Sequence, residues 1–85
     1  METQESSVID EIATGNKIKK LITESGLSIR QISEKMMFTT PTPVYKWIKG
    51  KSMPTIDNIV VLAFILGVKV DDIIVTKKIS EVSNV

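Results

Sequence analysis

The chain shows helical periodicity in four separate segments between residues 14 and 66. Within each segment, apolar residues recur three or four positions apart, which places their side chains on one face of an α-helix. Glycines and prolines separate the segments and interrupt the periodicity. We therefore predict four short helices that each bury one face. The predicted buried positions are Ile18, Leu21, Ile22, Ile32, Met36, Val44, Trp47, Ile48, Ile59, Leu62, Ala63 and Leu66.

The first two helices have recognisable ends. We predict the first over residues 14–25, because Gly26 can adopt the left-handed conformation that stops a helix. The second is predicted to open at Ser28 and to fade near Met37. Ser28 and Gln31 have the spacing of a capping box, in which each side chain accepts a hydrogen bond from the other residue's backbone N–H.

The third helix is predicted to begin with Thr40 as its N-cap and to end at Gly50. Pro41 suits the first helical position, where a backbone N–H is not needed, and Pro43 still falls in the first turn. The apolar stripe of this helix faces the core, so the opposite face should meet solvent. That outer face is polar, basic and aromatic, and it consists of Thr42, Tyr45, Lys46 and Lys49.

The fourth helix is predicted to begin after Thr55 as its cap and to end at Gly67. A short fifth helix is predicted over residues 70–75, with Asp71 as its cap. A helix that is apolar on all sides is usually covered on all sides, so the fourth helix should make a further contact. Its second apolar face consists of Val60, Val61, Phe64 and Ile65.

The 85 residues are enough for one domain with a small core. We predict an N-terminal arm over residues 1–13, a helical domain over 14–75 and a flexible C-terminal tail over 76–85. The polar, acidic start lacks the regions of a signal peptide. The longest apolar run, Ile59–Leu66, is too short to cross a membrane. We expect a cytoplasmic protein with no membrane partner.

The chain has no cysteine and no histidine. Disulfides, thiolate metal sites and the commonest catalytic base are therefore excluded, and we expect neither an enzyme nor a cofactor or metal site. The net charge is only +1, but no acid lies between Glu34 and Asp57. Such a segment is typical either of a solvated face or of a phosphate-binding surface. The lysines within it are Lys35, Lys46, Lys49 and Lys51.

Several short motifs follow one another along the helical segments. They are Gly26-Leu27-Ser28, Ile32-Ser33, Val44-Tyr45-Lys46-Trp47 with Gly50-Lys51, Pro54-Thr55, and Leu66-Gly67-Val68. In this order they resemble the Cro/CI-type (XRE-type) helix-turn-helix family, and in particular a subgroup with a proline at the start of the third helix. The resemblance implies an all-α fold, a compact five-helix bundle of the lambda-repressor-like type. The chain departs from the family pattern at the turn, where Met37 and Phe38 replace the usual glycine.

The resemblance also implies a binding mode, in which the third helix, at about residues 41–49, lies in the major groove of double-stranded DNA. Lys46 could donate to the acceptors of guanine, although an exposed surface lysine would have the same pattern. The predicted contacts to base edges come from Pro41, Thr42, Tyr45 and Lys46. The predicted contacts to phosphates come from Ser28, Arg30, Thr40, Lys49, Lys51 and Ser52.

We therefore expect a sequence-specific transcriptional regulator, a repressor, that binds a palindromic operator as a homodimer. Phe64 is expected to lie in or near a dimer contact. Alternatively, Val8, Ile9 and Ile12 of the arm fold back over the same face. A different function also fits the pattern. The domain could be a protein-interaction module, such as an antitoxin or a partner of another regulator, because a fold does not determine function.

Overall fold

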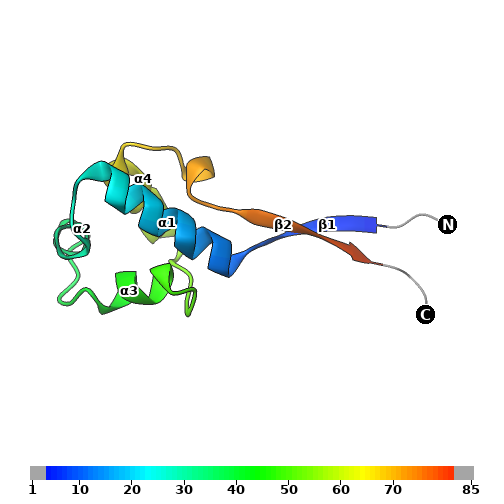
Figure 1. The fold of residues 1–85 in the computed structure, drawn as a ribbon, viewed down its shortest axis with the longest axis horizontal. Helices are drawn as coiled ribbons and strands as arrows, with labels where there is room; N and C mark the ends of the chain where they lie inside the picture. Colours follow the sequence, from blue (N-terminus) through cyan, green and yellow to red (C-terminus); the bar gives the residue numbers. More distant parts are fainter. Residues whose placement is uncertain (1–3, 82–85) are drawn as a thin grey trace.

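The computed structural model describes residues 4–81, and predictions for residues 1–3 and 82–85 lie outside this range. Within it, four α-helices enclose one core, and a two-stranded antiparallel sheet projects from them as a ribbon (Figure 1). The elements are β1 (Gln4–Ile9), α1 (Glu11–Ser25), α2 (Ile29–Lys35), α3 (Thr42–Ile48), α4 (Ile56–Leu66), the 3₁₀-helix η1 (Val70–Asp72) and β2 (Thr76–Glu81).

The core contains apolar side chains from all four α-helices. Each of the four α-helices has one predicted position that is fully buried. These positions are Ile18 in α1, Ile32 in α2, Val44 in α3 and Leu62 in α4. Ile73, just after η1, is buried to the same extent, although the sequence pattern did not single it out. The predicted stripes are thus confirmed at their centres, while Leu21, Met36, Ile48 and Leu66 at their margins are only partly buried.

Trp47, on the inner face of α3, packs against Phe38 in the segment that leads into this helix. Its side chain is only 4% exposed. The ring meets that of Phe38 edge to face, with the ring centroids 5.8 Å apart and the planes at 73°. This is a favoured arrangement of two aromatic rings. The contact fixes the rotation of α3 about its axis and thereby the direction of its outer face.

Four predicted helix ends are confirmed. Ser28 and Gln31 form the capping box of α2, with both hydrogen bonds present. The hydroxyl of Thr55 accepts a bond of 3.1 Å from the backbone N–H of Asn58 at the start of α4. Gly26 and Gly67 end α1 and α4 with φ of 79° and 71°. At these two positions, a residue with a side chain would be strained.

The start of α1 was predicted too late. The helix begins at Glu11, three residues before Thr14, because Asp10 caps it. The Asp10 carboxylate accepts a bond of 3.0 Å from the backbone N–H of Ala13, and the carbonyl of Asp10 accepts the first helical bond, from Thr14. An aspartate in this position satisfies an otherwise unpaired N–H of the first turn.

The start of α3 was predicted slightly too early. The helix begins at Thr42, and Pro41 rather than Thr40 is its N-cap residue. Pro41 has a ψ of 0°, away from the value of a regular helix, so the ladder of helical bonds starts only when its carbonyl accepts from Tyr45. The hydroxyl of Thr40 still accepts a long bond, 3.4 Å, from the N–H of Thr42.

The predicted fifth helix over residues 70–75 is wrong, because only Val70–Asp72 is helical and it is a single 3₁₀ turn. The chain cannot continue as a helix, since the backbone of Val75 is bonded to α1 instead. The Val75 carbonyl accepts from the N–H of Asp10 at 2.8 Å, and its N–H donates to the Thr14 hydroxyl at 3.0 Å. Thr14 is fully buried and donates its own proton back to the Val75 carbonyl.

The fold is mostly helical, as expected for the all-α class, but it has four α-helices instead of five, and it adds a two-stranded sheet that the sequence pattern missed. Thr76–Glu81 is a strand where we expected a flexible tail, and Gln4–Ile9 is a strand where we expected an arm. The two pair in antiparallel register, from Gln4 opposite Glu81 to Ile9 opposite Thr76. The anchored Val75 immediately precedes β2, so the ribbon starts from a fixed point on α1.

Gly15 sets the close approach between α1 and α3. A Cβ atom at this position would collide with the carbonyl oxygen of Trp47, and it would lie only 3.2 Å from that of Ile48. Only glycine lets α1 pass this closely over the C-terminal end of α3. The helix with the polar outer face is therefore held from two sides, by the aromatic contact in the core and by the backbone of α1.

Candidate nucleic-acid interface

The outer face of α3 is exposed, as its periodicity predicted. Val44 and Trp47 point into the core, so the residues on the opposite side of the helix meet solvent. Tyr45 is 44% exposed. Thr42, Lys46 and Lys49 are all exposed. This face combines two cations with hydroxyl groups, the side-chain types that donate hydrogen bonds to base edges and phosphates.

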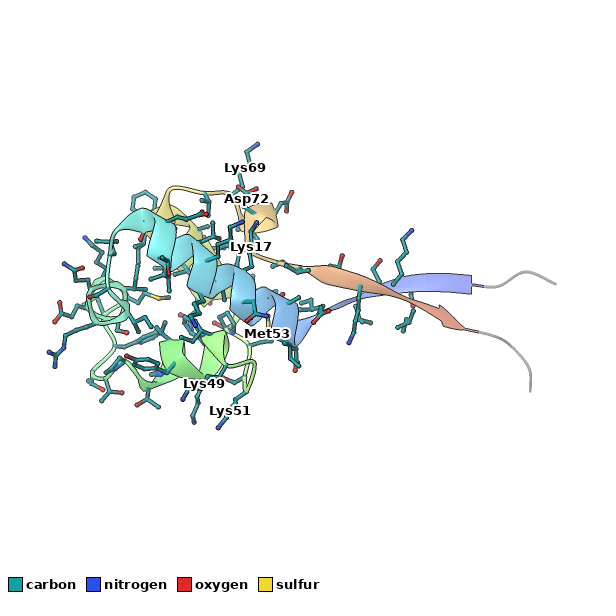
Figure 2. The ribbon with its side chains drawn as sticks, in the orientation of Figure 1. Lys17, Lys49, Lys51, Met53, Lys69 and Asp72 are labelled. Carbon is teal, nitrogen blue, oxygen red and sulfur yellow. The ribbon has the colours of Figure 1, made fainter. Side chains whose placement is uncertain are left out.

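Two further candidate residues follow the end of α3. Gly50 turns the chain with φ of 71°, and the backbone N–H groups of Lys51 and Ser52 both donate to the carbonyl of Lys46, at 2.9 and 3.4 Å. This compact turn keeps Lys51 beside Lys49. Figure 2 shows both lysines projecting from the end of α3 away from the helical core. Ser52, the next residue in the chain, is half-buried.

A hollow of about 130 Å³ lies between α2 and the entry to α3. It brings together three predicted contact residues from different parts of the sequence, Arg30, Thr40 and Pro41. Glu34 lines the same hollow, and its negative charge opposes a phosphate there. Arg30 and Thr40 are exposed and Pro41 is half-buried, so the hydrogen-bonding side chains remain accessible at the rim.

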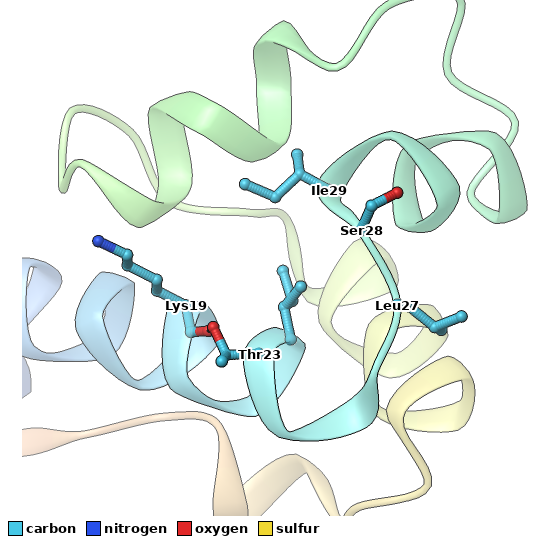
Figure 3. A pocket seen from close by; sticks show the side chains of 6 residues that line it. Lys19, Thr23, Leu27, Ser28 and Ile29 are labelled. Atoms are coloured by element: carbon cyan, nitrogen blue, oxygen red, sulfur yellow. The ribbon is translucent and has the colours of Figure 1, made fainter.

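Ser28 lines a second hollow, of about 230 Å³, between α1 and the start of α2 (Figure 3). Its oxygen accepts from the N–H of Gln31 at 3.0 Å, so its own proton stays available to donate. Lys19 and Thr23 of α1 line the same hollow. Lys19 was not among the predicted contacts, because periodicity places it off the buried stripe without showing which neighbour it faces.

The turn between α2 and α3 shows how the chain manages without the glycine that the family usually has there. Met37 has a φ of 64°, the left-handed conformation in which the resemblance led us to expect glycine. Its side chain is 89% exposed, so it avoids contacts that would oppose this backbone shape. The N–H groups of Met37 and Phe38 bond to the carbonyls of Glu34 and Ser33. The chain thus makes the turn without glycine, at a backbone cost of about 1–2 kcal/mol.

These features form two short helices joined by a tight turn, with the second helix held by the core and exposed outward. A helix-turn-helix family model matches residues 18–73, which is most of the chain. The chain belongs to the Cro/CI-type (XRE-type) helix-turn-helix family. The match includes α2 and α3 and stops before β2, so the ribbon lies outside it.

Three solved structures of other proteins have a similar fold. The restriction-modification controller protein C.AhdI of Aeromonas hydrophila superposes with a TM-score of 0.70 at 22% identity, over 75% of this chain and 96% of that one. The clp gene regulator ClgR of Corynebacterium glutamicum superposes with a TM-score of 0.69 at 17% identity, and the match covers 74% of this chain and 66% of that one. The DNA-binding domain of BldD superposes with a TM-score of 0.65 at 25% identity, and the match covers 75% of this chain and 92% of that one. No curated protein sequence matches the chain.

No group of three or more acidic side chains that could hold a metal ion occurs among the described residues. Across residues 4–81, no helix is both long enough and apolar enough to span a membrane.

The second apolar face of α4 is open in this helix-turn-helix domain. Phe64 is 87% exposed and Ile65 is half-buried. Ile56, one turn before Val60, extends the face and is 79% exposed, although the sequence analysis had not included it. Val60 and Val61 are exposed as well.

The alternative in which the arm covers this face is wrong. Val8 and Ile9 belong to β1 and pair with β2 in the ribbon. Ile12 lies on α1 next to Gly50, because a Cβ atom on that glycine would approach Ile12 Cγ1 to 3.2 Å. The arm residues therefore lie near the end of α3 and in the ribbon, and Phe64 remains open.

Proposed function

We propose that this protein is a sequence-specific DNA-binding transcriptional regulator, acting as a repressor, which reads the major groove with α3. The exposed, basic outer face of α3 carries the proposal, because this helix is fixed on its inner side by Trp47 and Gly15. Family membership supports it, and so does the fold shared with the DNA-binding domain of BldD and the regulators ClgR and C.AhdI. A rigid helix with an accessible basic face is what major-groove recognition requires.

The proposed contacts divide into two groups by position. Lys46, Thr42 and Tyr45 lie on the helix face and would meet base edges, with Pro41 in apolar contact at its start. Residues at the start of α2, at the entry to α3 and at the C-terminal end of α3 would bind phosphates, which position the protein without reading sequence. These are Ser28, Arg30, Thr40, Lys49, Lys51 and Ser52.

Replacing Lys46 and Lys49 with alanine should weaken binding to random duplex DNA about tenfold or more near 0.1 M salt, since the counterion release from one lost phosphate contact alone accounts for about this factor. The salt dependence should also become shallower, because each lost phosphate contact removes about one unit of slope. Fluorescence anisotropy with random duplex DNA at two salt concentrations measures both effects. Lys17→Ala/Lys69→Ala is the matched control, with the same charge change away from α3 (Figure 2). Equal loss in both variants would contradict a specific role of α3.

We further propose that the repressor is a homodimer on a palindromic operator, with Phe64 in or near the contact between the two copies. The exposed face of α4 supports a contact there, because contiguous exposed apolar residues mark interaction surfaces. The same observation favours the second candidate function, a module that binds another protein, such as an antitoxin. In that case the face would receive a different chain.

Phe64→Glu separates these two alternatives. The side chain is 87% exposed, so the charge should leave the fold intact, while a self-contact through this face should be lost. Sedimentation equilibrium should therefore give a dimer for the wild type and a smaller mass for the variant. An identical mass for the two proteins would rule out a dimer through α4 and favour a protein partner. Circular dichroism of the variant checks that the helices remain.

A further inference from the structure

The outer side of α4 has a self-complementary pattern of residues. Its positions are spaced one and three residues apart in alternation, and this spacing is the same in both directions from a point between Val60 and Val61. The six residues are Ile56, Asp57, Val60, Val61, Phe64 and Ile65. A surface with this symmetry can meet a second copy of itself across a two-fold axis.

One residue of this set is charged. Asp57 is exposed, and Val60, Val61 and Phe64 follow it by three, four and seven positions, so all four residues share one face of the helix. The three apolar members are between 41% and 87% exposed. The helix contains no lysine or arginine. An otherwise apolar face therefore includes one carboxylate and no cation that could pair with it.

We propose, on the basis of the homodimer proposed above, that α4 packs antiparallel against α4 of a second copy and that Asp57 limits the strength of this contact. The two-fold axis passes between Val60 and Val61. In this register, Val60 of each copy lies opposite Val61 of the other, and Ile56 lies opposite Ile65. Apolar residues thus face apolar residues at four of the six positions.

The charge of Asp57 favours the antiparallel direction over the parallel one. In a parallel pair of helices, Asp57 would face Asp57 of the other copy, and two like charges at short distance repel each other. In the antiparallel pair, Asp57 lies opposite Phe64, which separates the two carboxylates by seven residues along the helices. This is about 10 Å at the rise of an α-helix, a distance over which salt screens much of the repulsion.

The same register explains why Asp57 would weaken the contact. Its carboxylate would lie against the ring of Phe64 from the other copy, where it loses water and gains no hydrogen-bond donor. Placing a charge in such surroundings without a partner is unfavourable, and each dimer contains two such positions. The dimer would therefore dissociate on dilution, and binding to the proposed operator would depend steeply on the concentration of the protein.

Asp57→Asn should lower the dissociation constant of the dimer about tenfold, because it removes both unpaired charges from the contact. Sedimentation equilibrium over a range of protein concentrations measures this constant. Asp71→Asn is the matched control, since it makes the same charge change at an exposed position of η1. Asp57 also lies in the first turn of α4, where a negative charge stabilises the helix. If that were its only role, Asp57→Asn would lower the unfolding stability without tightening the dimer.

Two charges at position 64 test the register. Phe64→Lys would place a cation opposite Asp57 of the other copy, whereas Phe64→Glu would place a second acid there. Both variants lose the aromatic ring, but Phe64→Lys should associate about tenfold more tightly than Phe64→Glu, since each dimer has two such pairs. The difference should shrink when Asp57→Asn is added to both variants and should persist when Asp71→Asn is added instead. A difference that Asp57→Asn leaves unchanged would overturn the antiparallel register.

The outcomes separate the role of Asp57 from the dimer itself. If Phe64→Glu dissociates the dimer but Asp57→Asn does not tighten it, the dimer through α4 stands and the role of Asp57 is refuted. If Phe64→Glu leaves the mass unchanged, the dimer through α4 and its register are both refuted. No DNA is present in these measurements, so neither result depends on the proposed DNA binding.

Discussion

Replacing Gly15 with alanine is expected to lower the free energy of unfolding by about 3 kcal/mol, the upper part of the usual range for overpacking. At an exposed helix position, the same change would instead stabilise the protein by about 1 kcal/mol, because alanine has the higher helix propensity. Here the added methyl group meets the carbonyl oxygens of Trp47 and Ile48. Backbone atoms cannot rotate away as a flexible side chain can, so α1 and α3 must separate.

Urea unfolding of Gly15→Ala measures this loss, and Asn16→Ala provides the matched control. Asn16 is the next residue of α1 and is exposed, so its replacement should be neutral or slightly stabilising. DNA binding of Gly15→Ala should also fall under conditions in which the variant remains folded, because the collision occurs at the C-terminal end of α3. A stability equal to that of the wild type would show that the two helices are not in this close contact.

Trp47→Ala is expected to destabilise the protein by about 3–5 kcal/mol, the usual cost of removing a large aromatic side chain from a core. The loss is a large part of the total stability of a small domain, about 5–15 kcal/mol. The substitution removes the edge-to-face contact with Phe38 and leaves a cavity under α3. Both the midpoint of urea unfolding and the thermal midpoint should drop.

Tyr45→Ala is the matched control for Trp47→Ala, since it removes an aromatic residue from the exposed side of the same helix. Its stability should stay within about 0.5 kcal/mol of the wild type, as for most surface substitutions. Its affinity for DNA should fall, because Tyr45 lies on the proposed binding face. If instead the stability losses at Tyr45 and Trp47 were similar, the assignment of inner and outer faces of α3 would be wrong.

The sequence predicted the parts of the fold that depend on neighbouring residues. Caps such as Ser28 with Gln31, and the stop at Gly26, act within one turn of helix, so their spacing is visible in the chain. The division of α3 into an inner and an outer face also follows from periodicity alone. The outer residues of the candidate interface could therefore be named before the structure was known.

The parts that were missed depend on residues far apart in the sequence. Thr14 and Val75 are separated by 61 positions, and no local sequence pattern around either residue predicts the hydrogen bonds between them. The pairing of β1 with β2 is equally remote, so both strands seemed to be polar ends of the chain. The need for glycine at position 15 becomes visible only when α3 is placed against α1. The place of Glu34 beside Arg30 in the hollow likewise emerged from the fold.

The register of the ribbon has a mechanical consequence. Gln4 lies opposite Glu81 at the far end of the ribbon, so a force that pulls the backbones of these two residues apart loads one pair of facing residues at a time. The facing residue pairs would separate one after another toward Ile9 and Thr76, at low force, and the helices would carry no tension during this opening. The load would then reach the bonds that Thr14 makes with Val75. Tension on the two ends would thus be absorbed by the ribbon before it could displace α3.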